Sequence, residues 1–82
     1  MNNKRIGLGK EYYDNAILKF EGEYLNNKRN GKAKEYYDNG KLRFEGEYLN
    51  GKKWKGKEYV EDEIGYEIVE YLNGKKEVFE KK

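Results

Sequence analysis

The chain has 82 residues with 18 Lys and Arg against 16 Asp and Glu, so its net charge is only +2 and no basic block exists that would hold nucleic acid by charge alone. It is long enough for one small domain, and its 16% aromatic content is typical of a chain that folds. Cysteine, histidine, serine and threonine are absent, which excludes a disulfide framework, a thiolate metal site and most activated nucleophiles, so we predict a protein that is not an enzyme and has no cofactor.

The first residues contain no targeting signal. No apolar run follows Met1–Arg5, so we expect neither a secretory signal nor a membrane span, and hence a cytoplasmic protein. Residues 3–9 resemble residues 27–33 at an offset of 24. We therefore expect half a repeat unit over residues 1–9.

The rest of the sequence repeats itself. Residues 10–24 and 34–48 agree at 12 of 15 positions, and the three differing pairs are Ala16/Gly40, Ile17/Lys41 and Lys19/Arg43. A weaker third copy follows from Lys57 at an offset of 23. Self-similarity at this period is typical of an array whose units bury apolar surface by stacking on their neighbours. We predict a single array over residues 1–82, with units of roughly 10–33, 34–56 and 57–82 after the half unit.

Within each unit the apolar positions alternate, as in a half-buried strand. One face of the second copy carries apolar or small residues, with charged residues between them: Leu42, Phe44, Gly46 and Tyr48. A strand-like run over residues 33–38 precedes it, and Asn39-Gly40 separates the two, which is the strongest short-range signal for a hairpin. The next connection again contains Asn-Gly, at Asn50-Gly51, so the strands form an antiparallel meander.

The register of this hairpin has two solutions. A two-residue loop, which we favour, places Tyr37 opposite Leu42 and Glu35 opposite Phe44. A three-residue loop with a bulge brings Tyr36 onto the Leu42 face instead.

The third copy has lost one residue near Trp54, compared with the second. A one-residue slip would turn every later side chain to the opposite face of the sheet. We therefore expect the turn or a bulge to absorb the loss.

The order of aromatic and glycine residues resembles the MORN (membrane occupation and recognition nexus) repeat. The pattern of two aromatics flanking a glycine, followed by a turn glycine, is matched by Phe44, Gly46, Tyr48 and Gly51, and its first part by Phe20, Gly22 and Tyr24. The resemblance covers residues 3 to about 60. It implies an all-β, single-layer antiparallel meander of about three β-hairpin repeats, elongated and twisted, whose aromatic face forms a groove. It also implies a scaffold that binds protein partners or itself, and the family has been linked to phospholipids.

The aromatic stripe is the first candidate binding surface: Phe20, Tyr24, Phe44, Tyr48 and Tyr71. Aromatics at strand spacing are most often simply the core. A single-layer sheet, however, has no second layer to cover them, so we expect part of the stripe to be exposed and to contact a partner or a second copy.

Two further sets of aromatic residues are candidates. A second tyrosine stripe has the opposite parity, beside Lys10, Lys34 and Lys57: Tyr12, Tyr36 and Tyr59. It is either an interaction surface or packs across strands on Arg43 and Lys19. Trp54 either anchors a partner or fills a gap in the irregular third unit.

The repeated acidic residues Glu11, Glu35 and Glu58 form a third row. Equivalent positions lie two strands apart, about 10 Å, which is too far to share one metal ion. We expect a structural role, with the flanking lysines as partners.

These observations together predict a non-enzymatic repeat scaffold for protein–protein interaction or self-association through an exposed aromatic face. The alternative is peripheral binding to anionic phospholipid membranes, for which the cluster around Trp54 is weak support. We expect no nucleic acid and no metal among its ligands.

Overall fold

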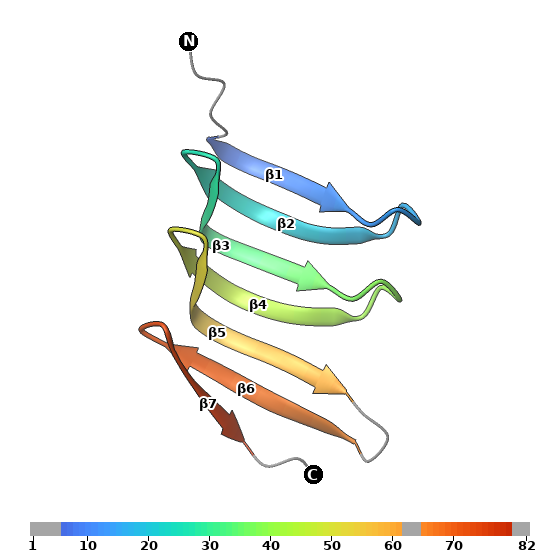
Figure 1. Cartoon of the computed structure of the whole chain (residues 1–82), viewed down its shortest axis with the longest axis vertical. Helices are drawn as coiled ribbons and strands as arrows, with labels where there is room; N and C mark the ends of the chain where they lie inside the picture. Colours follow the sequence, from blue (N-terminus) through green and yellow to red (C-terminus); the bar gives the residue numbers. More distant parts are fainter. Residues whose placement is uncertain (1–5, 62–64, 80–82) are drawn as a thin grey trace.

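A computed structural model describes residues 6–61 and 65–79 of the chain (Figure 1). In these ranges seven strands form one sheet: β1 (Gly7–Tyr12), β2 (Leu18–Leu25), β3 (Lys28–Tyr36), β4 (Leu42–Leu49), β5 (Lys52–Glu61), β6 (Tyr66–Leu72) and β7 (Lys75–Phe79). Each strand pairs antiparallel with the next in chain order. The predicted all-β meander is therefore confirmed. Residues 1–5 of the predicted half unit lie outside the described ranges.

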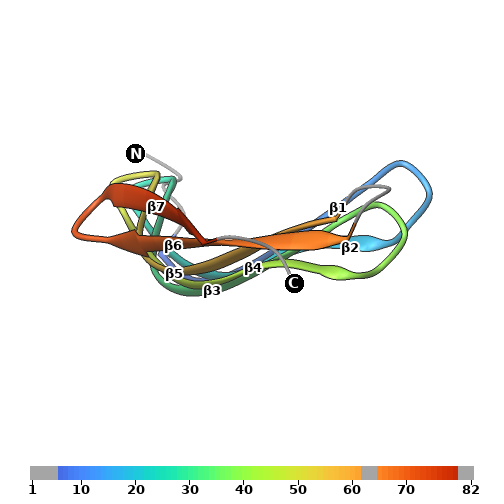
Figure 2. The same ribbon diagram turned by 90° about the horizontal axis from the view of Figure 1, so that it is seen from below.

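The sheet is a single curved layer. Its extents are 50 × 33 × 12 Å, and the shortest is the thickness of one sheet with its side chains. Figure 2 shows that the two rows of hairpin turns, one at each end of the strands, bend toward the same side. The molecule is therefore a trough with a concave and a convex face. No described segment forms a helix long and apolar enough to cross a membrane.

The β3–β4 hairpin combines both predicted registers. Glu35 lies opposite Phe44, as the two-residue loop requires, but Tyr36 pairs with Leu42 after a bulge, as the three-residue loop requires. The predicted pair of Tyr37 with Leu42 is wrong, because the Tyr37 amide donates to the Lys41 carbonyl at 2.8 Å. The Gly40 amide donates back to the Tyr37 carbonyl at 2.9 Å. Asn39-Gly40 therefore belongs to a three-residue loop in which Gly40 has a φ of 90°.

The turns at the other end of the strands are two-residue turns. Both central residues have positive φ in each of them: Asn26 and Asn27, Asn50 and Gly51, Asn73 and Gly74. Consecutive positive φ values define a type I′ turn, whose twist matches that of the flanking strands. Hairpins are thus joined by hairpins, as predicted.

The residue missing from the third copy is absorbed in a bulge. Between β2 and β3, Gly22 pairs with Ala33 and Tyr24 with Arg29. An advance of two residues along β2 therefore corresponds to four residues along β3, which leaves two extra residues in β3. Between β4 and β5 the corresponding shift is smaller, and a single extra residue, Trp54, lies between the partners of Glu47 and Tyr48. The predicted absorption by a turn or bulge is confirmed, and the later strands keep their faces.

The aromatic stripe is the core of the concave face. Phe20 and Phe44 are 0% exposed, and Tyr24 and Tyr48 are 5% exposed. Successive rings, ending at Tyr71, meet edge to face with centroids 5.5–5.9 Å apart. The expectation of an exposed aromatic face is therefore wrong for these four rings.

Cations cover these rings in place of a second layer. The Arg29 guanidinium carbon lies 4.0 Å from the centroid of Phe20, and Lys53 Nζ lies 5.1 Å from that of Phe44. Both cations stand on the strand that follows the ring they cover. Such cation–π contacts combine with the alkyl stems of the side chains to keep water from the rings.

Candidate binding groove

Above the aromatic core, acidic and basic side chains alternate along the middle of the trough and form a charge row: Glu11, Arg29, Glu35, Lys53 and Glu58. Arg29 Nη2 lies 2.9 Å from Glu11 Oε1, and Arg29 Nη1 lies 2.6 Å from Glu35 Oε2. Lys53 Nζ lies 3.7 Å from Glu35 Oε1 and 2.9 Å from Glu58 Oε1. The structural role predicted for the glutamates holds. The predicted partners are wrong, because the flanking lysines are one residue away and point to the convex face.

Tyrosine hydroxyls complete the same row. Tyr24 donates to Glu11 and Tyr48 donates to Glu35, while the Tyr71 hydroxyl donates to Glu58 at 3.0 Å. Each acidic residue of the row thus receives one hydroxyl and at least one cation. These groups satisfy one another and hold adjacent units together.

The ionisation of this row reflects its contacts. Burial alone would raise the pKa of Glu11, but hydrogen bonds from Arg29 and Tyr24 outweigh it and hold this pKa below the ordinary value. Glu58 behaves in the same way, with Lys53 and Tyr71 as its main donors. Burial and the neighbouring carboxylate raise the pKa of Tyr71 to about 12.

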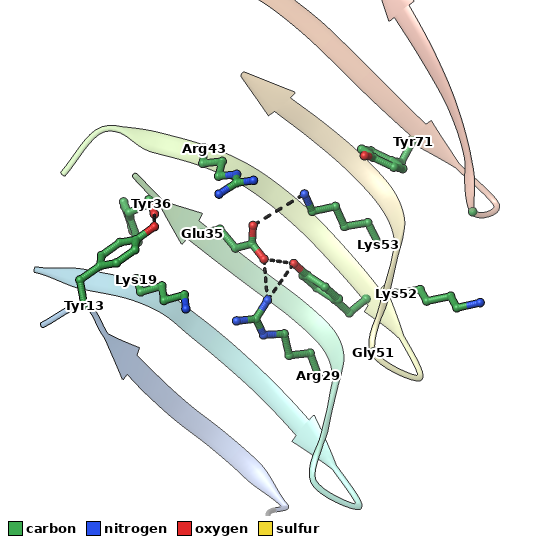
Figure 3. Close-up of a pocket in the computed structure, with 12 residues that line it drawn as sticks. Tyr13, Lys19, Arg29, Glu35, Tyr36, Arg43, Gly51, Lys52, Lys53 and Tyr71 are labelled. Carbon is green, nitrogen blue, oxygen red and sulfur yellow. Dashed lines mark hydrogen bonds and ion pairs between the residues drawn. The ribbon is translucent and has the colours of Figure 1, made fainter. Parts of the chain in front are cut away.

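Over this row lies a groove of about 610 Å³, shown in Figure 3. Its walls come from both rows of turns, with Tyr13 at one end and Gly51 and Gly74 at the other, so it lies inside the trough. Its charged lining comprises five cations and one carboxylate: Lys19, Arg29, Arg43, Lys52, Lys53 and Glu35. Even when Glu11 and Glu58 below it are included, cations exceed carboxylates by five to three.

Arg43 is one of the cations that line the groove. Its Nε atom is buried and has no hydrogen-bond acceptor in the described part of the chain, since its ion-pair contact to Glu58 Oε2 is 3.7 Å long. The guanidinium lies 5.3 Å from the ring centroid of Tyr37. In the preceding unit, Lys19 Nζ lies 5.5 Å from the ring centroid of Tyr13. The first two units thus each present a cation beside a tyrosine ring to the groove.

The sequence patterns did not identify these residues as a site. Lys19 and Arg43 follow a strand parity that assigns them to the convex face. Each is the extra residue of a bulge: Lys19 lies between Leu18 and Phe20, the partners of Tyr12 and Glu11, and Arg43 lies between Leu42 and Phe44, the partners of Tyr36 and Glu35. The bulges turn both side chains into the trough. The available signal was that both copies keep a cation at this position.

The structure divides the predicted binding residues between two faces. Tyr48 and Tyr71 line the groove, while Phe20, Tyr24 and Phe44 lie beneath it. The side chains of the second stripe, Tyr12, Tyr36 and Tyr59, point to the convex face, and Tyr36 also contributes to the lining of the groove. There the Tyr36 hydroxyl donates to Glu21 at 3.3 Å, and Tyr12 is exposed. The predicted packing of this stripe on Arg43 and Lys19 is wrong, since both cations are on the other face beside Tyr37 and Tyr13.

Trp54 lies apart from both stripes, in the bulge of β5. Its carbonyl accepts the Gly74 amide at 2.9 Å, and its ring lies against this next turn. It therefore packs across the turn that follows, which agrees with the gap-filling interpretation, and one edge of the ring stays in contact with solvent.

The side chains that line the groove are mostly cations and tyrosines. No group of three or more acidic residues in the described ranges is placed to hold a metal ion. The carboxylates of the row are each paired with a cation. Cationic donors and tyrosine faces remain for a ligand that carries negative charge.

The comparisons with known proteins agree with this architecture. Residues 29–50 match the family model of the MORN repeat variant, and this range spans β3, β4 and the loop between them. Neither the curated proteins nor the solved structures gave a match. The hairpin of β1 and β2 has nearly the same sequence as the matched one, and β5 and β6 continue the sheet in the same way. The β3–β4 hairpin is therefore a MORN repeat of this variant type, set in a sheet of similar hairpins.

Proposed function

We propose that this protein is a non-enzymatic repeat scaffold that binds an extended, acidic segment of a protein partner along its concave groove. The observation that carries the proposal is the excess of cations in the groove lining, two of them beside tyrosine rings. Tyrosine and arginine are the residue types enriched at protein interfaces.

The shape of the trough favours an extended chain as the ligand. The groove floor is recessed between two rows of turns, and a flat bilayer surface would contact the turns before it reached the floor. An extended peptide can follow the floor across the strands. Its carboxylates would meet the Lys19 ammonium and the Arg43 guanidinium, which both line the groove.

Titration of a fluorescent peptide tests this function. The probe is a short peptide in which Glu alternates with Val, and the same peptide with Lys in place of Glu is the ligand control. We expect the acidic peptide alone to bind, and Arg43→Gln to weaken binding about tenfold, since a charge-assisted hydrogen bond is worth roughly 1.5–3 kcal/mol.

The matched protein control is Lys34→Gln. Lys34 is an exposed cation of the convex face that pairs with Glu45 at 3.8 Å. It should leave peptide affinity unchanged. Equal loss of affinity in the two variants would indicate attraction by net charge and would contradict recognition in the groove.

A second candidate function rests on a different surface. Leu25, Leu49 and Leu72 are exposed, each immediately before a two-residue turn, and each lies opposite a lysine across the turn: Lys28, Lys52 and Lys75. A row of exposed leucines with basic neighbours is suited to the interface of an anionic membrane. We call these three leucines and three lysines the turn rim. The turn rim supports peripheral membrane binding as the alternative function.

Co-sedimentation with vesicles distinguishes the two functions. If the turn rim binds membranes, the chain should sediment with phosphatidylserine vesicles but not with phosphatidylcholine vesicles, and salt should release it. The double variant Leu49→Asp and Leu72→Asp should abolish sedimentation, whereas Arg43→Gln should not. No sedimentation at low salt would leave the groove as the functional surface.

A further inference from the structure

Exposed apolar side chains gather at one edge of the sheet. Three of the seven large apolar side chains that are exposed in the described ranges lie on or beside β1: Ile6 at 70%, Leu8 at 83% and Tyr12 at 57%. Leu8 and Tyr12 share the convex face of this strand. Strand β1 is the first strand of the sheet, so within residues 6–61 and 65–79 no strand pairs with the backbone groups along its outer edge.

The two edges of the sheet differ in how they are protected. Natural sheets protect an edge with short strands, lysines, prolines or bulges. Strand β7 has five residues and begins with Lys75 and Lys76. Strand β1 pairs with β2 without a shift from Gly7 to Glu11, meets a bulge in this ladder only before Tyr12, and carries Lys10 as its single lysine.

The sequence of β1 is that of an interior strand. Its residues 7–12 correspond to residues 31–36 of β3, with Gly, Lys, Glu and Tyr at the same places. Strand β3 is paired on both sides. The outer edge of β1 therefore has the pattern of a strand that accepts a neighbour.

We propose that a second copy of this chain pairs with β1 through its own β1, antiparallel, about a two-fold axis at Gly9. The two sheets then continue as one. This inference is independent of the groove and of the turn rim, because it uses neither surface.

The residue pattern favours a second copy as the neighbour. A row of small residues crosses five strands: Gly9, Gly22, Ala33, Gly46 and Gly56. Pairing of Gly9 with Gly9 of the second copy extends this row by one strand. The same strand supplies both sides, as a two-fold interface requires.

This register also keeps like charges apart. Leu8 then faces Lys10 of the second copy, whose alkyl stem can cover it, and Glu11 faces Gly7. A register about Lys10 would instead place two lysines opposite each other, which is destabilising. The axis at Gly9 is therefore preferred.

Engineered cysteines test the register directly, because the chain contains no cysteine. We expect Leu8→Cys mixed with Lys10→Cys to form a mixed disulfide on oxidation, since directly opposed residues lie about 4.5–5.5 Å apart. Either variant alone should cross-link poorly, because the equivalent residues are diagonal and about 7–8 Å apart. Efficient cross-linking of Lys10→Cys alone would overturn the axis at Gly9.

Light scattering tests the interface itself. The unmodified chain should have twice the chain mass, and Leu8→Lys should halve it, with an unchanged circular dichroism spectrum because this side chain is exposed. The control Leu72→Lys, at an exposed leucine of β6, should remain a dimer. A monomeric wild-type chain at high concentration, or a dimer that survives Leu8→Lys, would overturn the proposal.

Discussion

At the scale of single residues, Ala16 shows how a near-identical repeat stores strain. It has a φ of 69°, at the loop position where the second unit has Gly40 with a φ of 90°. The amide of Ala16 donates to the Tyr13 carbonyl as that of Gly40 does to Tyr37. The two loops therefore have the same conformation, and only one of them has the residue that suits it.

We expect Ala16→Gly to stabilise the protein by about 0.5–1 kcal/mol. A left-handed alanine costs about 1–2 kcal/mol, and the greater chain entropy of glycine removes part of that gain. The measurement is the free energy of unfolding in urea. Gly40→Ala is the reverse control and should destabilise by a similar amount. A loss of stability in both variants would show that the loops tolerate alanine differently.

Arg29 joins two units, because it contacts Glu11 on one side and Glu35 on the other. Its side chain is 24% exposed. Arg29→Leu leaves both carboxylates without their guanidinium, and we expect it to lower the free energy of unfolding by about 2–4 kcal/mol, near the cost of breaking a buried pair.

The comparison for this variant is Lys41→Met. Lys41 pairs with Glu61 at 3.0 Å, but both side chains are about 60% exposed. Such a surface pair contributes about 0–1 kcal/mol. Equal effects of the two substitutions in the same urea titration would contradict a structural role for the charge row.

At the scale of elements, the close approach of β4 and β5 depends on two glycines. A Cβ atom at Gly46 would lie 2.0 Å from the Lys55 carbonyl oxygen and 2.6 Å from the Gly56 Cα atom. These are backbone atoms, so no side-chain rotation relieves the clash. We expect Gly46→Ala to destabilise by about 2–3 kcal/mol. Thermal unfolding followed by circular dichroism measures the effect.

Gly7 is the matched position for this experiment. It has a φ of 97° but no atom within 4 Å of an added Cβ. Gly7→Ala therefore incurs only the backbone cost of about 1–2 kcal/mol. If Gly46→Ala were the milder change, the strands would be able to separate without loss of packing.

At the scale of the whole molecule, the charge row makes stability depend on pH at both extremes. The pKa values of Glu11 and Glu58 are held below the ordinary value, so these carboxylates bind fewer protons folded than unfolded. Their contribution is complete above about pH 4.5 and is lost as the pH falls. The raised pKa of Tyr71, about 12, contributes stability that is complete below about pH 10 and is lost above it.

We therefore expect stability to change little from about pH 6 to pH 9, where no histidine or cysteine titrates, and to fall on both sides. Urea midpoints across the pH range measure the profile. Tyr71→Phe should reduce the alkaline decline and leave the acidic one. A maximum of stability below pH 4 would contradict the pairing of Glu11 and Glu58.

Much of the fold could be predicted from sequence. The repeat of residues 10–24 at 34–48, with Asn-Gly between alternating runs, is sufficient for a meander of hairpins, because turn and strand preferences are local. The loop register was harder to predict. Asn39-Gly40 favoured a two-residue loop but is also compatible with a three-residue loop, and a bulge beside Tyr36 lets the β3–β4 hairpin combine both registers.

By itself, the sequence determined which side chains of the regular strand segments share a face, because alternation along a strand without bulges depends only on the backbone. Only the tertiary structure decided which of them meet water. Arg29 and Lys53 reach the rings of Phe20 and Phe44 from the following strand, and bulges turn Lys19 and Arg43 into the trough. Burial in a single-layer sheet depends on curvature and on contacts between strands, which local alternation does not contain.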